Sequence, residues 1–375
     1  MRLSEHLEVR VDDTPGSRRN RVDAPQQLLV RSQGTNLWCF HVPEPKHVVF
    51  LQVCKTTTPG AYTSSHGAER CSWRLGTCLP SGVLDEAGYI ATHQNQIQAL
   101  SLITDGTCVD ADVGLDGLAK LNQLRHVSWD GLYEARALSP LAQCLDRNRN
   151  HLRSLRLGFC ELYDCHENCQ AMSSVLLDRL QQGLPKGAVK FPLLDALSLS
   201  NATFLAKKEL ALTVLNIANL RSLTLRDCSF QLEFLESLAT LRPGVRLTHF
   251  GICFDEFREP DLLLDTHPVL DFLVSFAGLE SLHVLISNSF RPGDWFARPV
   301  EHHRASLKRL VHHERSLMPL DGRAIFEETR DIPTSWISQI DHALDSSVVR
   351  ALGLCLSPSV AVSPHRHSQI MIWNR

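Results

Sequence analysis

The sequence predicts an α/β solenoid, in which short parallel strands line the inside of an arc and helices lie outside. Two observations lead to this fold class. The stretches 152–162 (LRSLRLGFCEL) and 220–230 (LRSLTLRDCSF) share one eleven-residue pattern of leucines and a cysteine. Similar apolar triplets recur at steps close to 27 residues, with apolar residues at helical spacing between several of them. A repeated strand–helix unit buries its apolar face by stacking on its neighbours, so an elongated array follows.

Composition narrows the function classes. The chain has 375 residues, 43% apolar and 21% charged, with a formal net charge of −3. We therefore expect a folded protein that does not bind nucleic acid through bulk charge. We expect no membrane association, since no apolar run approaches the ~20 residues of a membrane span and the start lacks a signal-peptide core. Twelve cysteines without such a signal predict reduced thiols and an intracellular location, in cytoplasm or nucleus.

Residues 1–90 form a poorly patterned N-terminal region that we expect to be partly disordered. Charged residues, Pro and Gly are scattered through it, and residues 56–67 are rich in Thr, Ser, Gly and Ala. Two short apolar runs, Gln27 to Val30 and His47 to Val53, could form strands.

The repeat pattern occupies residues 91–360, with about eight or nine irregular units. The first residues of successive apolar strands are Ile97, Leu124, Leu152, Leu194, Leu220, Leu247, Leu279, Leu307 and Val349. The steps between them are 27, 28, 42, 26, 27, 32, 28 and 42 residues, so five of the eight lie between 26 and 28. That period leaves room for a helix between strands.

Helical spacing appears between several of these strands. The apolar sets are Leu176, Leu177 and Leu180; Leu210, Val214, Leu215 and Ala218; Leu232, Leu235, Leu238 and Leu241; and Leu262, Val269, Leu270, Leu273 and Phe276. We expect Pro268 near the start of the last helix. The two steps of 42 contain insertions at about 163–190 and 315–348, which we expect to be surface loops. Residues 361–375 are treated as a tail.

The pattern L-x-x-L-x-L-x-x-C-x-L is that of a leucine-rich repeat. Residues 91–360 resemble the ribonuclease-inhibitor-like leucine-rich-repeat proteins, most of all the fungal ones, many of which carry an F-box. The marks are the stretches 152–162, 194–204 and 220–230. The resemblance implies repeats that hold a substrate and an N-terminal module that docks onto the adaptor of a cullin ubiquitin ligase. The chain departs from it in having no recognisable F-box: Leu79-Pro80 leads into Ser81-Gly82-Val83 and straight into the array.

Side chains alternate along a strand, so the residues between the leucines face the open concave side. The candidate partner-binding residues there are Arg156, Thr224, Arg226, His249, His283, Arg309 and His313. Glu is absent from the concave positions, and Asp130 is their single Asp. We therefore expect a neutral-to-basic face that binds an acidic or phosphorylated protein segment. A solvated strand face without a partner is the alternative that the sequence leaves open.

Catalytic and metal-binding signals are weak. Cys160, Cys165, His166 and Cys169 form a cluster, but C-x4-C-x3-C is not a usual zinc spacing, and the repeat already accounts for Cys160 and Cys228. We interpret His302-His303 and His312-His313 as surface histidines. The motifs G-x-S-x-G, G-x-x-x-x-G-K-[ST] and H-E-x-x-H are absent.

The sequence thus predicts a protein–protein interaction scaffold that is not an enzyme and has no catalytic residues, metal or cofactor. Substrate recognition for a ubiquitin ligase is a narrower hypothesis within that class. Two other classes stay open: an enzyme with an unrecognised site in residues 1–90, and a degenerate repeat protein without activity.

Overall fold

The computed structural model of the chain has an α/β architecture. The structure describes residues 28–32, 35–41, 48–54, 70–74, 83–94, 96–104, 114–133, 135–159, 166–182, 190–204, 214–240, 244–255, 268–287, 296–320, 323–328 and 349–354. The candidate metal ligands Cys160 and Cys165, and the tail 361–375, lie outside these ranges.

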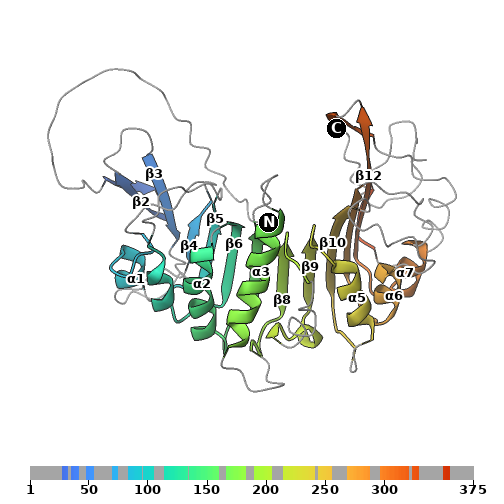
Figure 1. Ribbon diagram of the computed structural model, residues 1–375, viewed down its shortest axis with the longest axis horizontal. Helices are drawn as coiled ribbons and strands as arrows, with labels where there is room; N and C mark the ends of the chain where they lie inside the picture. Colours follow the sequence, from blue (N-terminus) through green and yellow to red (C-terminus); the bar gives the residue numbers. More distant parts are fainter. Residues whose placement is uncertain are drawn as a thin grey trace.

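Within these ranges, fourteen strands form one sheet. Its parallel part runs through β4 (Arg70–Trp73), β5 (Ala99–Ile103), β6 (His126–Leu132), β7 (Ser154–Phe159), β8 (Ala196–Ser200), β9 (Ser222–Arg226), β10 (His249–Asp255), β11 (Ser281–Ser287), β12 (Arg309–Leu320) and β14 (Ala351–Leu354). Each is the parallel neighbour of the next. Figure 1 shows these strands following one another along the molecule.

Antiparallel strands extend both ends of this sheet. β1 (Leu28–Ser32), β2 (Thr35–His41) and β3 (Val48–Cys54) precede β4. At the other end the second half of β12 pairs with β13 (Arg323–Glu328), within a segment expected to be a surface loop. The sheet therefore continues through the boundary placed at residue 90, and β4 already belongs to its parallel part.

Helices connect the parallel strands and lie on one face of the sheet (Figure 1). They are α1 (Tyr89–His93), η1 (Asp116–Lys120), α2 (Ala135–Arg147), α3 (His166–Gln181), η2 (Ile217–Asn219), α5 (Gln231–Ala239), α6 (Pro268–Val274) and α7 (Ala297–His302). The predicted helices at 176–180 and 232–238 fall in α3 and α5. Pro268 is the first residue of α6, where its missing N–H has no helical partner to lose. α3 occupies part of the insertion 163–190, which was expected to be a loop.

The predicted apolar triplets form the core between sheet and helices. Nine of their members, in β7, β8 and β9 and the residues before them, are at most 7% exposed: Leu152, Leu155, Leu157, Leu194, Leu197, Leu199, Leu220, Leu223 and Leu225. Aromatic rings fill the same layer further on, and Phe204 stacks on Phe234 with ring centroids 4.0 Å apart. The alternating burial of β8 and β9 follows from the pleat, which turns every second side chain toward the helices.

Two predicted surface histidines are buried instead. His312 takes the third triplet position in β12, is 1% exposed, and packs against the Phe296 ring at 4.3 Å. His303 is 2% exposed, and its Nε2 lies 2.8 Å from the carbonyl oxygen of Leu273. The surface interpretation was therefore wrong for one residue of each pair, because the partners that bury them come from preceding units. Within the ranges given above, no helix has the length and apolar character needed to cross a bilayer.

Candidate functional site

The candidate site lies on the face of the sheet opposite the helices, which we call the uncovered face. Neighbouring strands pair without register shift from β7 to β12, so side chains at equivalent positions form rows across the sheet. One row contains Arg156, Ser198, Thr224, Gly251, His283 and Val311. These residues alternate with the buried leucines, so the uncovered face is built from the residues that the core does not use.

All seven sequence-predicted candidates lie on the uncovered face. His249 and Arg309 stand at strand starts, Arg156, Thr224 and His283 in the middle row, and Arg226 and His313 in the row beyond. The structure brings Arg156, Thr224 and Arg226 together around one hollow. Arg309 and His313 belong to β12, three strands from β9. Their common role in binding stays a prediction.

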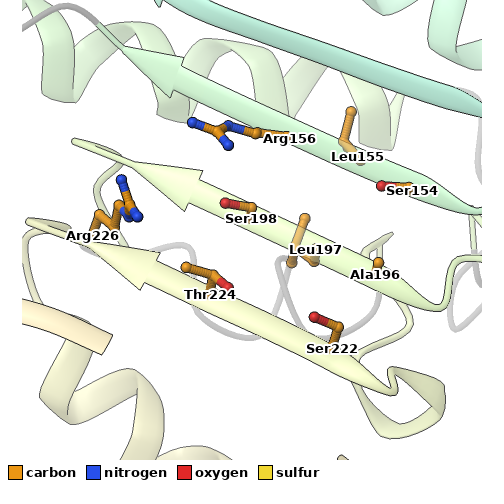
Figure 2. Close-up of a pocket in the computed structure, with 9 residues that line it drawn as sticks. All are labelled: Ser154, Leu155, Arg156, Ala196, Leu197, Ser198, Ser222, Thr224 and Arg226. Atoms are coloured by element: carbon orange, nitrogen blue, oxygen red, sulfur yellow. The ribbon is translucent and has the colours of Figure 1, made fainter. Parts of the chain in front are cut away.

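The hollow lies over β7, β8 and β9 and has a volume of about 280 Å³. Its lining includes Ser154, Arg156, Ala196, Ser198, Ser222, Thr224 and Arg226. Figure 2 shows Arg156 and Arg226 on the two outer strands, at the same end of the hollow, with Ser198 on the strand between them. The short side chains of β8 leave this space open, and hydroxyl groups make its floor polar.

Arg156 is held by a carboxylate from the neighbouring strand. Its Nη2 lies 3.0 Å from Asp130 Oδ2, and its Nε donates to Asp130 Oδ1 at 3.3 Å. Two glycines make this pair possible. A Cβ on Gly158 would lie 2.6 Å from Asp130 Oδ1, and Gly131 takes φ +88° at the register shift of β6, where its own Cβ would meet the Thr104 carbonyl oxygen. The bidentate pair therefore fixes one edge of the Arg156 guanidinium.

Arg226 has no such partner: none of the carboxylates that the structure describes lies within ion-pair distance of its guanidinium. Its side chain is exposed at the rim of the hollow. The charge acts on β11, two strands away, where burial and then the Arg226 charge lower the pKa of His283 below its usual value. This end of the hollow is therefore electropositive.

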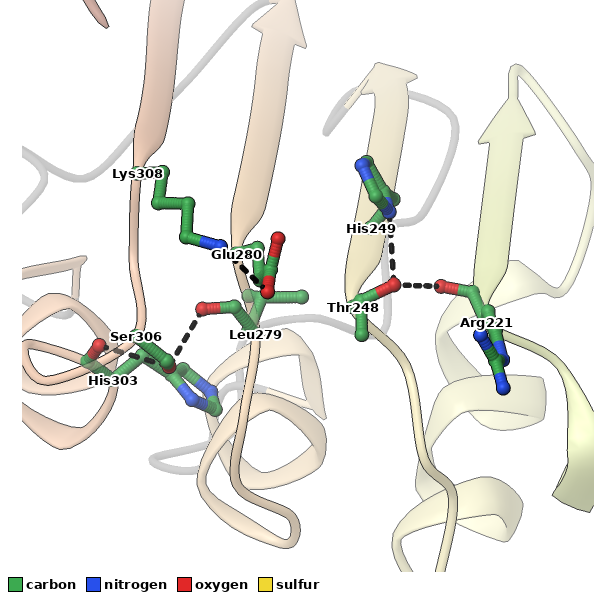
Figure 3. A network of polar contacts seen from close by, with 8 residues as sticks. All are labelled: Arg221, Thr248, His249, Leu279, Glu280, His303, Ser306 and Lys308. Carbon is green, nitrogen blue, oxygen red and sulfur yellow. Dashed lines mark hydrogen bonds and ion pairs between the residues drawn. The ribbon is translucent and has the colours of Figure 1, made fainter. Parts of the chain in front are cut away.

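The part of the uncovered face beyond β9 has a different character. His249 is held by Thr248, whose hydroxyl lies 2.9 Å from His249 Nδ1 and donates to the Arg221 carbonyl oxygen at 3.1 Å (Figure 3). Glu280 lies beside this group, and its contact with Lys308 at 2.8 Å lowers the pKa of the carboxyl. On β12, Val311 is 38% exposed. This region mixes neutralised charges with apolar surface.

Thiol and metal chemistry find little support among the residues that can be placed. Burial raises the pKa of Cys71, Cys144 and Cys228 to about 12, so these thiols stay protonated and unreactive near neutral pH. No group of three His, Cys, Asp or Glu side chains in the described ranges could hold a metal ion. The side chains of His166 and Cys169 are outside the description.

Sequence reasoning placed Arg156, Thr224 and Arg226 on this face but missed the ion pair between Asp130 and Arg156. Asp130 and Arg156 are 26 residues apart and meet diagonally across β6 and β7. The small residues Ala196 and Ser198 on the strand between two arginines were the signal that could have located the hollow.

No protein-family model, curated protein or solved structure matches the chain.

Proposed function

We propose that the chain is a ribonuclease-inhibitor-like leucine-rich-repeat protein that acts without catalysis, by binding another protein across the uncovered face of its sheet. The observation that carries the proposal is the hollow over β7–β9, which lies on this face between two arginines. A sheet face built from small polar residues between longer charged ones offers hydrogen-bonding groups to an extended chain. The recurrence of the leucine triplets, five of whose eight steps are 26–28 residues, supports the repeat assignment.

The partner segment is acidic or phosphorylated. Arg226 and Arg309 give the face its positive charge, and His249, His283 and His313 lie on the same face. Asp130, the single Asp predicted there, is engaged by Arg156. A negatively charged segment gains attraction from such a face, whereas a basic segment would be repelled.

A displayed library of random linear peptides, selected on the wild-type protein, tests the proposal. Selected peptides should be enriched in Asp and Glu. The double variant Arg226→Glu/Arg309→Glu should bind them at least about tenfold more weakly, since a charge-assisted hydrogen bond contributes on the order of 1.5–3 kcal/mol. Affinity is measured by fluorescence anisotropy, and thermal unfolding checks that both proteins are folded.

Arg298→Glu/Arg304→Glu is the matched control, because Arg298 and Arg304 are exposed arginines in and just after α7, and this variant changes the net charge by the same amount. It should leave peptide affinity unchanged. If both variants weaken binding equally, only net charge matters and the uncovered face has no special role. If the double variant binds as wild type does, the proposal fails.

A further inference from the structure

The two arginines of the hollow differ in whether a carboxylate neutralises their charge. The Asp130 carboxylate engages Arg156 through Nε and Nη2, which leaves the Nη1 donors of that guanidinium uncommitted. Arg226 stands two strands away with no carboxylate of the described residues in reach. The pair Asp130–Arg156 has no net charge, so the net positive charge of the hollow comes from Arg226. Asp227, the next residue along the chain, accepts a hydrogen bond from Cys253 Sγ at 3.5 Å.

Hydrogen-bond donors approach the hollow from three directions. β7 and β9 are two strand spacings apart, about 10 Å, and an arginine side chain from each can reach over β8. Ser198 lies on β8 between them, and Thr224 lies beside Ser198 in register. A planar carboxylate has two oxygens and is satisfied by one guanidinium fork, as Asp130 is. A tetrahedral phosphate has three terminal oxygens and can use donors on both sides and on the floor.

We propose that the hollow seats the phosphate of a phosphorylated side chain in an extended protein segment, with Arg226 as its main ligand and the hydroxyls of Ser198 and Thr224 beneath it. This rests on the proposed function and names the chemical group that the partner contributes. Arg156 adds its uncommitted edge. Asp130 is a built-in anion that offsets the charge of Arg156 and so moderates the attraction of the hollow for phosphate.

The role of Asp130 makes opposite predictions for neighbouring residues. Asp130→Asn removes the negative charge that offsets Arg156 and should tighten the binding of a dianion. The expected gain in affinity is about fourfold, for a distance of about 10 Å in water between the phosphate and the Asp130 carboxylate. Arg156→Gln leaves Asp130 unpaired and should weaken binding by a similar factor. The double variant Asp130→Asn/Arg156→Gln removes a neutral pair, so its affinity should stay closer to wild type than that of either single variant.

The experiment uses three peptide libraries that are identical except for a central phosphoserine, glutamate or serine. The full-length protein should bind the phosphoserine library at least about tenfold more tightly than the glutamate library, which is the effect of one further charge-assisted hydrogen bond. Arg226→Gln should remove that preference, whereas Arg298→Gln should retain it. Fluorescence anisotropy at two salt concentrations measures the affinities for the phosphoserine and glutamate libraries.

Several results would overturn the inference. Equal affinity for the phosphoserine and glutamate libraries would mean that the hollow accepts any anion, and the acidic-partner proposal would survive without the phosphate. Inorganic phosphate that competes as well as the best phosphopeptide would identify an ion site and no segment. An unchanged preference in Arg226→Gln would place the phosphate elsewhere. If the full-length protein binds none of the three libraries, both the inference and the proposed function are wrong.

Discussion

Two turns in different parts of the chain have the same backbone but are braced by different side chains. Asn148 stands four residues before Leu152, and His303 stands four residues before Leu307. Each accepts hydrogen bonds from the backbone N–H groups three and four residues later, and each donates its own N–H to the carbonyl four residues earlier. Both side chains are buried and reach back to a carbonyl of a preceding unit.

The two turns differ in how many polar atoms of the Asn148 and His303 side chains have hydrogen-bond partners. Asn148 donates from Nδ2 to the carbonyl oxygens of Leu121 and Cys144, both at 2.7 Å, and its Oδ1 accepts from the Leu124 N–H at 2.8 Å. His303 donates from Nε2 to Leu273, while its buried Nδ1 has no hydrogen-bond partner (Figure 3 shows the His303 turn with Ser306). An amide carries both donors and an acceptor, whereas a neutral imidazole with one donated proton keeps a lone pair. One backbone turn can therefore be insensitive or sensitive to pH, depending on whether Asn or His holds it.

The largest loss of stability is expected at the Asn148 turn, whose side chain has all its hydrogen bonds. Asn148→Ala leaves the Leu124 N–H and the Leu121 carbonyl buried without their partner, and each unsatisfied group costs about 1–3 kcal/mol. We expect the free energy of unfolding to fall by about 3–4 kcal/mol, measured by chemical denaturation. Asn219→Ala is the control, since Asn219 is exposed and donates to Asn216 Oδ1 at 3.0 Å. A loss for Asn148→Ala as small as that of the control would show that the Asn148 brace is dispensable.

A smaller, pH-dependent effect is expected at the His303 turn. Burial, opposed by the bond to Leu273 and assisted by the charge of His302, lowers the pKa of His303 from 6.5 to about 4. Between these values the unfolded chain holds the proton and the folded chain does not. Stability should therefore fall as pH drops from 6.5 to 4, at up to about 1.4 kcal/mol per pH unit for this group, and be unaffected by it above 6.5.

The variant His303→Asn isolates that contribution, because asparagine does not titrate. Its unfolding free energy should change less between pH 7 and pH 4 than that of wild type, whatever its stability at pH 7. His302→Asn, on the exposed neighbour, should keep most of the wild-type slope. Parallel pH profiles for wild type and His303→Asn would mean that His303 is protonated as readily in the folded protein as in the unfolded one.

The leucine periodicity was enough to predict the parallel strands β5 to β12 and β14 and the core beneath them. Leu220, Leu223 and Leu225 lie where a strand with one buried face puts them, since burial imposes an alternation that the sequence displays directly. β4 was missed because its buried residues are Cys71 and Trp73 rather than leucines. The β12–β13 hairpin was missed for a different reason, as nothing in residues 309–328 marks the pairing as antiparallel.

The sequence predicted which residues lie on the uncovered face, but it did not predict the contacts between them. Alternation places Arg156 and Arg226 on the uncovered face as surely as it buries Leu155 and Leu225. It does not reveal that Asp130 folds over Gly158 to engage Arg156, because that contact depends on a missing Cβ and a shifted register in the preceding strand. The buried His312 is similar: its burial depends on Phe296, which precedes the strand.

The proposed binding depends on the positive charge of Arg226, which has no carboxylate partner among the described residues. An NMR titration of His283 in wild type and in Arg226→Gln tests it most directly, since burial and the Arg226 charge together lower the pKa of His283. Removing the charge should raise the pKa of His283, and Arg309→Gln should raise it less. An unchanged pKa of His283 in Arg226→Gln would mean that the guanidinium is neutralised or directed away from the face, and the proposed binding would lose its basis.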